Sequence, residues 1–369
     1  MKHLLFTTLI LITSMGSWAQ SLPKGMKLLN TCEATEVKSQ DRTGTCWSFS
    51  TTSYLESEVL RTQHKTVNLS EMYTVRNIYV EKAERYLRYH GHRPFSQGSL
   101  AHDVYHAYDA YGMMTEEAYP GKQPDSLHNH TAMEKTLKSY LDSILKTGTI
   151  PSTWKTSFNQ LLDSYLGTVP SSFTYEGKSY TPATFTRDVL KLNMGDYVGF
   201  TSFAHQPLHQ FVVVQVPDNF SDGTYFNTKI DDLVSIVNHA LSQGMSIEWD
   251  GDVSETGFLG RTGYAVLCED TTLLKNDPLK CQEPAINQMD RQKEFDNLHT
   301  TDDHLMHITG LVKHSDGRTF YLVKNSWGTK PGWDGYLLMS EAYFKMKTVS
   351  IYLNRNALSQ EFLNLISSN

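Results

Sequence analysis

Apolar residues recur along the chain with two different periods, and these periods predict where helices and strands form. Between Trp47 and Leu60 the apolar residues follow a helical spacing, and turn-forming residues at 41–44 precede them, so a helix is expected to begin near Cys46. Towards the end of the chain, the segments 300–312 and 320–339 have the composition of strands. The pattern therefore predicts helical structure early in the chain and strands late.

The region between these segments is long enough to hold an insertion. Its first part, from about residue 119 to 170, contains amphipathic helical stretches separated by turn residues, and Leu137, Tyr140, Leu141 and Ile144 fall on one helical face. A coil-rich stretch, 259–301, follows later. The sequence shows no internal repeats, low-complexity tracts or phosphate-binding glycine loop.

The first residues have the order of a secretory signal peptide. Lys2 precedes an apolar run from Leu4 to Ile12, and the small residues Ser17 and Ala19 follow, so cleavage is expected after Ala19. The run is too short for a permanent membrane anchor, and no apolar run of spanning length follows it. We expect a protein exported to the periplasm or secreted; a buried N-terminal helix is the alternative.

Composition indicates a soluble globular protein, with 39% hydrophobic and 20% charged residues. The formal net charge of −7 gives no electrostatic footprint for nucleic acid. The chain has four cysteines, Cys32, Cys46, Cys268 and Cys281, too few for a disulfide scaffold. Cys268 and Cys281 are the best candidate pair because they would close a short loop, and two free thiols are the alternative.

Cys46 stands where a thiol is easily activated. A helix N-terminus favours negative charge, and the thiolate is the nucleophilic form of cysteine, although a buried and inert cysteine is equally compatible with this stretch. Gln40 lies six residues earlier, where its amide and the backbone N–H of Cys46 could both donate to an oxyanion. A histidine in the first strand-like run and Asn325 in the second complete a candidate catalytic set.

These segments resemble those of papain-like cysteine peptidases. The run KNSWGTKPGWDGYLLM, which contains Asn325, is close to the asparagine motif of that family, and TGTCW keeps Gly44, Cys46 and Trp47 of its cysteine motif. Thr43 replaces the first cysteine of that motif, which removes half of a disulfide common in the family. The resemblance implies an α+β fold with two lobes, one helical and one β-barrel-like, and a catalytic cleft between them.

The resemblance also assigns roles to the candidate residues. His304 is the expected base because it stands six residues before Gly310, and His307, which would face the other side of an extended strand, is the alternative. Cys46 and His304 would form a thiolate–imidazolium pair that Asn325 orients, with Gln40 in the oxyanion hole. The family has no metal or cofactor, and we expect none here; His90 and His92 are interpreted as solvated loop residues.

Five further residues are expected near the substrate. Gly98 would offer backbone hydrogen bonds to an extended peptide, with a plain loop turn as the alternative, and Ser99 stands where the family usually has a second glycine. Trp327 is expected to shield the bond between the histidine and the asparagine from water. Trp47 and Asp303 flank the nucleophile and the base in the sequence.

The spacing of the motifs indicates one branch of the family. His304 lies 258 residues after Cys46 (304 − 46), against about 130–150 in papain itself. This insertion, together with runs such as YTPATFTRDVL, VPDNFSDGTYFN and IEWDGDVS, resembles bleomycin hydrolase and aminopeptidase C. Cys46 also lies too early in the chain for the long propeptide of secreted cathepsins. The resemblance implies an aminopeptidase that acts on short peptides, and a six-fold ring assembly.

On this basis we divide the chain into a signal peptide, 1–19, and one peptidase domain, 20–369. Within the domain we expect a helical lobe over 20–120, a mostly helical insertion over 121–198 and a β-rich lobe over 199–369.

The C-terminal tail departs from the branch. In that branch the terminal carboxylate enters the cleft and holds the α-amino group of the substrate. Here the tail, Arg355 to Asn369, is short and ends in FLNLISSN, which does not resemble the usual ending. An endopeptidase with an open cleft is therefore an alternative, and a non-catalytic peptide-binding relative or an acyl transferase are others.

Overall fold

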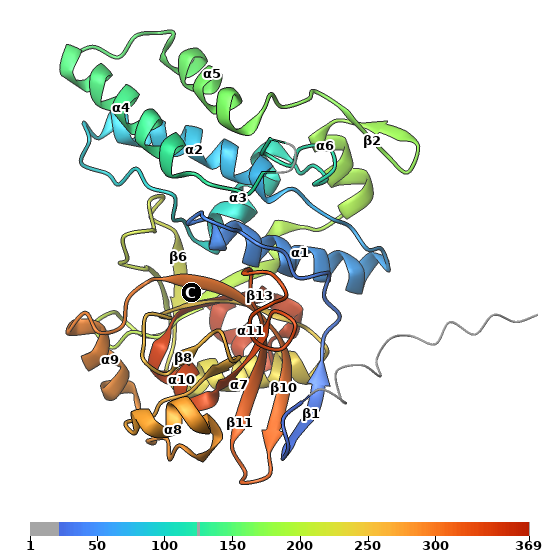
Figure 1. Cartoon of the computed structure of the whole chain (residues 1–369), viewed down its shortest axis with the longest axis vertical. Coiled ribbons are helices and arrows are strands. Elements are labelled where there is room, and N and C mark those ends of the chain that lie inside the picture. The colour runs from blue at the N-terminus through green and yellow to red at the C-terminus, as the bar shows by residue number, and fades with distance from the viewer. Residues whose placement is uncertain (1–21, 124–125, 369) are drawn as a thin grey trace, which may run out of the picture.

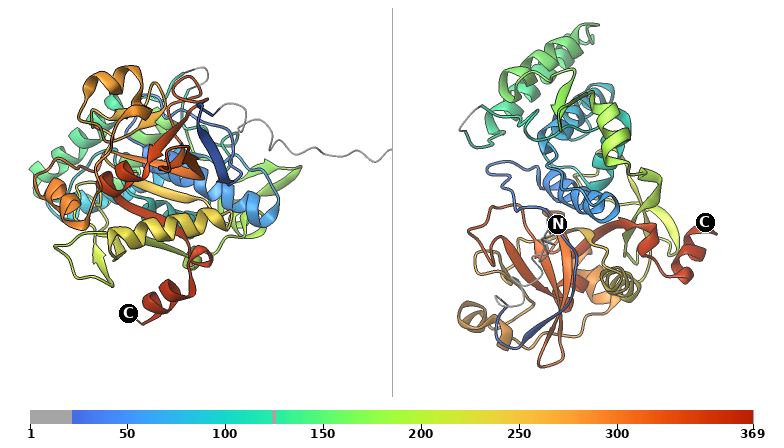
Figure 2. Two further views of the ribbon diagram at one scale, coloured as in Figure 1. Left: turned by 90° about the horizontal axis from the view of Figure 1, so that it is seen from below. Right: turned by 90° about the vertical axis from the view of Figure 1, so that its right-hand side faces the viewer.

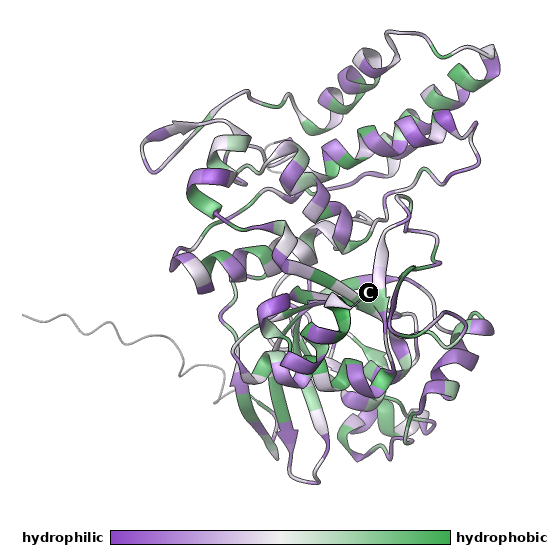
Figure 3. Cartoon of the chain, turned by 180° about the vertical axis from the view of Figure 1, so that it is seen from behind, coloured by the Kyte–Doolittle hydropathy of each residue, from purple (hydrophilic) through white to green (hydrophobic). Residues whose placement is uncertain are grey.

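Helices and strands gather in two lobes, and the long helix α1 (Cys46–Gln63) lies between them (Figure 1). The structure is a computed structural model that describes residues 22–123 and 126–368. The expected signal peptide falls outside these residues. None of the described helices is long and apolar enough to cross a membrane. Figure 3 shows hydrophobic residues along the central strands and many hydrophilic residues on the outer helices.

Besides α1, the helical lobe contains five α-helices, two short helices of other types and a small hairpin. The helix expected from the apolar face is present: Leu137, Leu141 and Ile144 are buried, and Tyr140 is partly buried against the same core. The elements of this lobe are α2 (Glu71–Arg88), α3 (Ala101–Tyr111), α4 (Thr131–Thr147), α5 (Trp154–Leu166), β2 (Phe173–Tyr175), β3 (Lys178–Tyr180), α6 (Pro182–Phe185), η2 (Thr186–Leu190) and η3 (Met194–Asp196).

The β-rich lobe contains one large sheet with strand order β5-β6-β4-β13-β7-β10-β11-β12-β9-β8. Its strands are β4 (Tyr197–Thr201), β5 (Gln210–Val213), β6 (Thr224–Asn227), β7 (Ile247–Gly251), β8 (Phe258–Leu259), β9 (Tyr264–Ala265), β10 (His304–His314), β11 (Thr319–Lys324), β12 (Tyr336–Ser340) and β13 (Thr348–Asn354). The helices are α7 (Ile230–Ser242), α8 (Thr271–Asn276), η4 (Pro278–Lys280), α9 (Gln288–Asp296), α10 (Glu341–Lys347), η5 (Arg355–Ala357) and α11 (Gln360–Ser367).

Two segments of the chain differ from what the sequence predicts. Strand β1 (Met26–Thr31) pairs antiparallel with β10, so the described chain begins in the β-rich lobe before it enters the helical one. The stretch 259–301, expected to be coil-rich, contains short strands and helices. It contains a disulfide between Cys268 and Cys281, the best candidate pair in the sequence, and not the two free thiols of the alternative; Cys32 and Cys46 are free.

Helix α1 is buried on all sides over its first 14 residues, Cys46 to Val59, because α2 and α3 cover one side and β10 and β7 the other. Such a helix normally carries apolar residues all round. Here its two glutamates are paired instead: Glu56 accepts from the backbone N–H of Leu69 at 2.8 Å, and Glu58 binds Arg61. The position of α1 between the lobes fixes its first residue at their junction.

The described part of the C-terminal tail packs on the β-rich lobe. Ile366 of α11 is buried in the core that α7 and the strands share, and Phe362 and Leu363 pack against that core. In the right-hand view of Figure 2, α11 projects on the side of the molecule away from the blue segment that leads into α1. Through Ser368, the tail therefore lies against the β-rich lobe.

Candidate active site

Three elements that are far apart in the sequence bring Cys46, His304 and Asn325 together. Cys46 is the first residue of α1, His304 is the first residue of β10, and Asn325 directly follows β11, as expected. Strands β10 and β11 pair antiparallel, and β10 packs against α1. A backbone hydrogen bond from Leu305 reaches the thiol of Cys46, so the sulfur lies beside the start of β10, where His304 is placed.

His304 and Asn325 form the hydrogen bond that the sequence predicts. Nε2 of His304 donates to Oδ1 of Asn325 over 2.8 Å, and both residues are buried. The same oxygen also accepts from the backbone N–H of Ser326 at 2.7 Å, which fixes the amide. The indole of Trp327 packs against the imidazole, with ring centroids 4.9 Å apart, and its shielding of the bond to Asn325 from water stays a prediction. Among the described residues, Nδ1 of His304 has no hydrogen-bond partner.

Gln40 is held rigidly next to this group. Its Nε2 donates to the carbonyl of Thr43 at 2.8 Å, and its Oε1 accepts from the hydroxyl of Ser326 at 2.6 Å. Among the described residues, the second hydrogen on Nε2 and the backbone N–H of Cys46 have no hydrogen-bond acceptor. These are the two donors that an oxyanion hole at Cys46 requires.

Burial acts on the two central groups in opposite directions. Burial raises the pKa of the Cys46 thiol to about 12. The hydrogen bond from Leu305 opposes this rise, and the carboxylates of Asp302 and Asp218 add to it. Burial lowers the pKa of His304 to about 4, against its bond to Asn325. Each group alone is therefore driven to its neutral form. Only the attraction between the two charges, formed together by one proton transfer, favours the ionised pair expected from the sequence.

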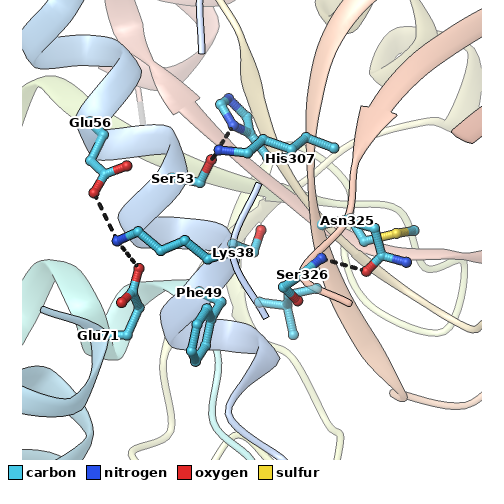
Figure 4. Close-up of a pocket in the computed structure, with 12 residues that line it drawn as sticks. Lys38, Phe49, Ser53, Glu56, Glu71, His307, Asn325 and Ser326 are labelled. Carbon is cyan, nitrogen blue, oxygen red and sulfur yellow. Dashed lines mark hydrogen bonds and ion pairs between the residues drawn. The ribbon is translucent and has the colours of Figure 1, made fainter. Parts of the chain in front are cut away.

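The alternative base, His307, lies elsewhere. It is fully buried, its Nδ1 is hydrogen-bonded to Ser53 Oγ at 3.0 Å, and Lys324 donates to the same hydroxyl at 2.8 Å. In Figure 4, Ser53 and His307 lie apart from Asn325, and Lys38 lies between Glu56 and Glu71. Ser53 is seven residues, or two helical turns, beyond Cys46 on α1, so His307 belongs to the packing between α1 and the sheet.

The segment 96–99, which we call the wall segment, is fastened beside the nucleophile. Gln97 accepts from the backbone N–H of Gly44 at 2.8 Å and, through its carbonyl, from the indole N–H of Trp47 at 2.9 Å. The buried amine of Lys82 donates to the carbonyls of Ser96 and Gly98. These bonds place Gly98 next to the first turn of α1.

Three of the residues expected near substrate have structural partners. Trp47 is buried and acts through its bond to the wall segment. The hydroxyl of the buried Ser99 donates to the carboxylate of Asp103 at 2.6 Å at the start of α3. Asp303 accepts from the backbone N–H of Ser254 at 3.1 Å and so holds the loop after β7. Their contacts with substrate stay predictions.

Comparison with known proteins identifies the family. Residues 167–369 match the Peptidase C1-like family, and residues 22–196 match the papain family of cysteine proteases. The chain belongs to the Peptidase C1-like family. Aminopeptidase C of Lactobacillus delbrueckii subsp. lactis is 22% identical over 371 residues, which cover 88% of this chain and 80% of the relative. Bleomycin hydrolase of Rattus norvegicus is 22% identical, and the match covers 90% of this chain and 83% of that protein.

A solved structure agrees with this assignment. PepW from Lactobacillus rhamnosis HN001 matches with a TM-score of 0.74 and 19% identity, over 93% of this chain and 85% of that one. The α+β papain-like fold expected from the sequence is thereby confirmed. The chain is a papain-like cysteine peptidase of the branch that includes aminopeptidase C and bleomycin hydrolase.

Sequence reasoning missed two carboxylates at the peptidase site. Asp218, in the loop between β5 and β6, lies directly against Gly98: a Cβ added to Gly98 would overlap its carboxylate. Asp302, two residues before His304, accepts a hydrogen bond from the backbone of Asp218. The doubled aspartate before the histidine was a signal for Asp302. Nothing in the local sequence indicated that Asp218 would lie at the wall segment.

Proposed function

We propose that this peptidase cleaves peptide bonds with Cys46 as nucleophile and His304 as the proton carrier. The thiol proton passes to Nδ1 of His304, and the sulfur attacks the scissile carbonyl carbon. The oxyanion is stabilised by the N–H groups of Gln40 and Cys46. His304 then gives its proton to the leaving amine, and the thioester that remains is hydrolysed by a water that His304 deprotonates. Asn325 keeps the imidazole oriented throughout.

One observation carries this proposal: the 2.8 Å bond between His304 and Asn325, placed beside a cysteine at a helix N-terminus. Such a bond fixes the tautomer that leaves Nδ1 free to accept a proton from the sulfur. The non-catalytic alternative would not require a buried histidine, an orienting amide and two free oxyanion donors to converge on one thiol.

We propose further that the peptidase is an aminopeptidase for short peptides and that it acts outside the cytoplasm. The names of the relatives, aminopeptidase C and bleomycin hydrolase, support the first part. The N-terminal apolar run from Leu4 to Ile12 supports the second. An endopeptidase is the second candidate, because α11 packs on the β-rich lobe and leaves the surroundings of Cys46 free of the tail through Ser368.

The test compares three forms of the enzyme on aminoacyl-coumarin substrates. Cys46→Ala should remove hydrolysis completely, whereas Cys32→Ala, which removes another buried free thiol, should keep it. Turnover that persists in Cys46→Ala would refute the proposed chemistry. A digest of peptides with free and N-acetylated ends, read by mass spectrometry, then separates stepwise loss of N-terminal residues from internal cuts.

A further inference from the structure

Asp218 occupies an unusual position beside the nucleophile. It lies in the loop 214–223, and its carboxylate rests on the face of Gly98 that a side chain would otherwise fill. The wall segment that contains Gly98 is bonded to the first turn of α1 through Trp47. A half-buried carboxylate therefore covers the backbone along which an extended peptide is expected to run.

The loop that carries Asp218 is held in place by several bonds. Asn219 donates to the carbonyls of Val214 and Gly223, at 2.8 and 2.9 Å, and closes the loop on itself. Arg85 of α2 donates to the carbonyl of Phe220 at 2.8 Å, and the ring of Phe220 is buried. These bonds fix the residues on both sides of Asp218, so the carboxylate is presented from a rigid support.

The carboxylate of Asp218 has no hydrogen-bond or ion-pair partner among the described residues. The nearest cation, Lys82, instead donates to carbonyls of the wall segment. Asp302 adds a second carboxylate, and its Oδ2 is buried without a hydrogen-bond partner. Burial and the charge of Asp218 raise the pKa of Asp302 to about 7. Among the described residues, no cation therefore forms an ion pair with the carboxylate of Asp218 or Asp302.

We propose that Asp218 binds the α-ammonium group of the substrate and thereby sets the N-terminal residue beside Cys46. The inference rests on the proposed peptidase chemistry at Cys46. When the sulfur attacks the first peptide carbonyl, the α-nitrogen is attached to the neighbouring carbon, on the side of the wall segment. An ammonium there would meet the unpaired carboxylate of Asp218 and form a charge-assisted hydrogen bond.

The same side chain would exclude longer or blocked substrates. A residue N-terminal to the one that is released would have to pass over Gly98, and Asp218 fills that space. An acetyl group would bring a neutral amide to a carboxylate that then stays unpaired. A metal ion is a poorer fit for this charge, because no group of three or more metal-ligating side chains occurs in the part of the chain that the structure describes. The carboxylate of Asp218 thus attracts a free α-ammonium group and also excludes longer or blocked peptides.

The experiment measures kcat/KM for a matched pair of peptides, one with a free amino end and one N-acetylated. In Asp218→Asn the preference for the free amine should fall by roughly tenfold to a hundredfold, mainly through KM, because a charge-assisted bond is lost. Asp218→Glu should restore part of it. Asp222→Asn changes the same charge in the same loop, where Asp222 binds Arg93 at 2.9 Å, and should keep the wild-type preference.

Three results would overturn the inference. The first is an unchanged preference in Asp218→Asn, and the second is equal cleavage of free and acetylated peptides by the wild-type enzyme, which needs no variant. The third is a strong preference for acetylated peptides with Lys or Arg before the scissile residue. That result would show that Asp218 binds a basic side chain of the substrate and not its α-ammonium group. In each case, loss of activity on alkylation of Cys46 would show that the proposed chemistry still holds.

Discussion

Removing the imidazole of His304 should leave the Cys46 thiol without a proton acceptor, so that burial alone sets its pKa. In the proposed mechanism, transfer of the thiol proton to His304 allows a thiolate at neutral pH in the wild type. In His304→Ala the thiol keeps its burial-raised pKa of about 12, so at pH 7 only about 10⁻⁵ of it is ionised. A more basic thiolate is more nucleophilic. With a Brønsted slope of about 0.4–0.5, the roughly eight pK units between this pKa and the value of about 4 for a histidine-paired thiolate recover about three to four orders of magnitude. Alkylation should therefore slow roughly tenfold to a hundredfold.

The assay follows alkylation of the intact protein by iodoacetamide, a neutral reagent, with mass spectrometry. A Cys32→Ala background leaves Cys46 as the only free thiol, because Cys268 and Cys281 are bonded to each other. The deprotonated form reacts, so the rate in the variant should rise about tenfold per pH unit from pH 7 to 10, while the wild type should reach a plateau near neutral pH. A variant with the wild-type rate and plateau would refute the ion-pair reasoning.

Three further predictions test the site and its support. Asn325→Ala should lower kcat/KM about 5- to 150-fold, because a buried ring N–H loses its acceptor at 2.8 Å, and Asn325→Asp should keep more activity. Breaking the disulfide with Cys268→Ala should lower the free energy of unfolding by roughly 3 kcal/mol, because the disulfide joins two residues that are 13 positions apart and so closes a loop. An unchanged melting temperature would contradict this prediction. Lys38→Met should cost roughly 3–5 kcal/mol in urea unfolding, because two buried glutamates lose their cation, whereas Lys155→Met, in an exposed pair, should change stability by less than about 1 kcal/mol.

Local patterns located most of the candidate catalytic residues. The turn residues before Cys46 and the apolar spacing after it predicted the start of α1, and the strand-like run ending at Asn325 predicted the end of β11. The choice of His304 over His307 followed from spacing to Gly310, and the structure gives His304 the bond to the amide. These features depend on residues close in sequence, whose backbone preferences and periodicity act over a few positions.

Other features appeared only in the folded chain. The pairing of β1 with β10 joins residues nearly 290 positions apart, as Met26 lies opposite His314, and no local signal specifies such a partner. The burial of polar residues on every side of α1 also depends on the fold, because both lobes cover this helix.

The sequence by itself determined the family, the candidate nucleophile, base and orienting amide, and the helical or strand character of the segments that carry them. The tertiary structure alone decided that α11 packs on the β-rich lobe and that Asp218 rests on Gly98, 120 residues away (218 − 98). The physical reason is the distance along the chain over which each interaction acts. Conformational preferences are set by neighbouring residues, whereas contacts between distant segments are set by how whole lobes pack together.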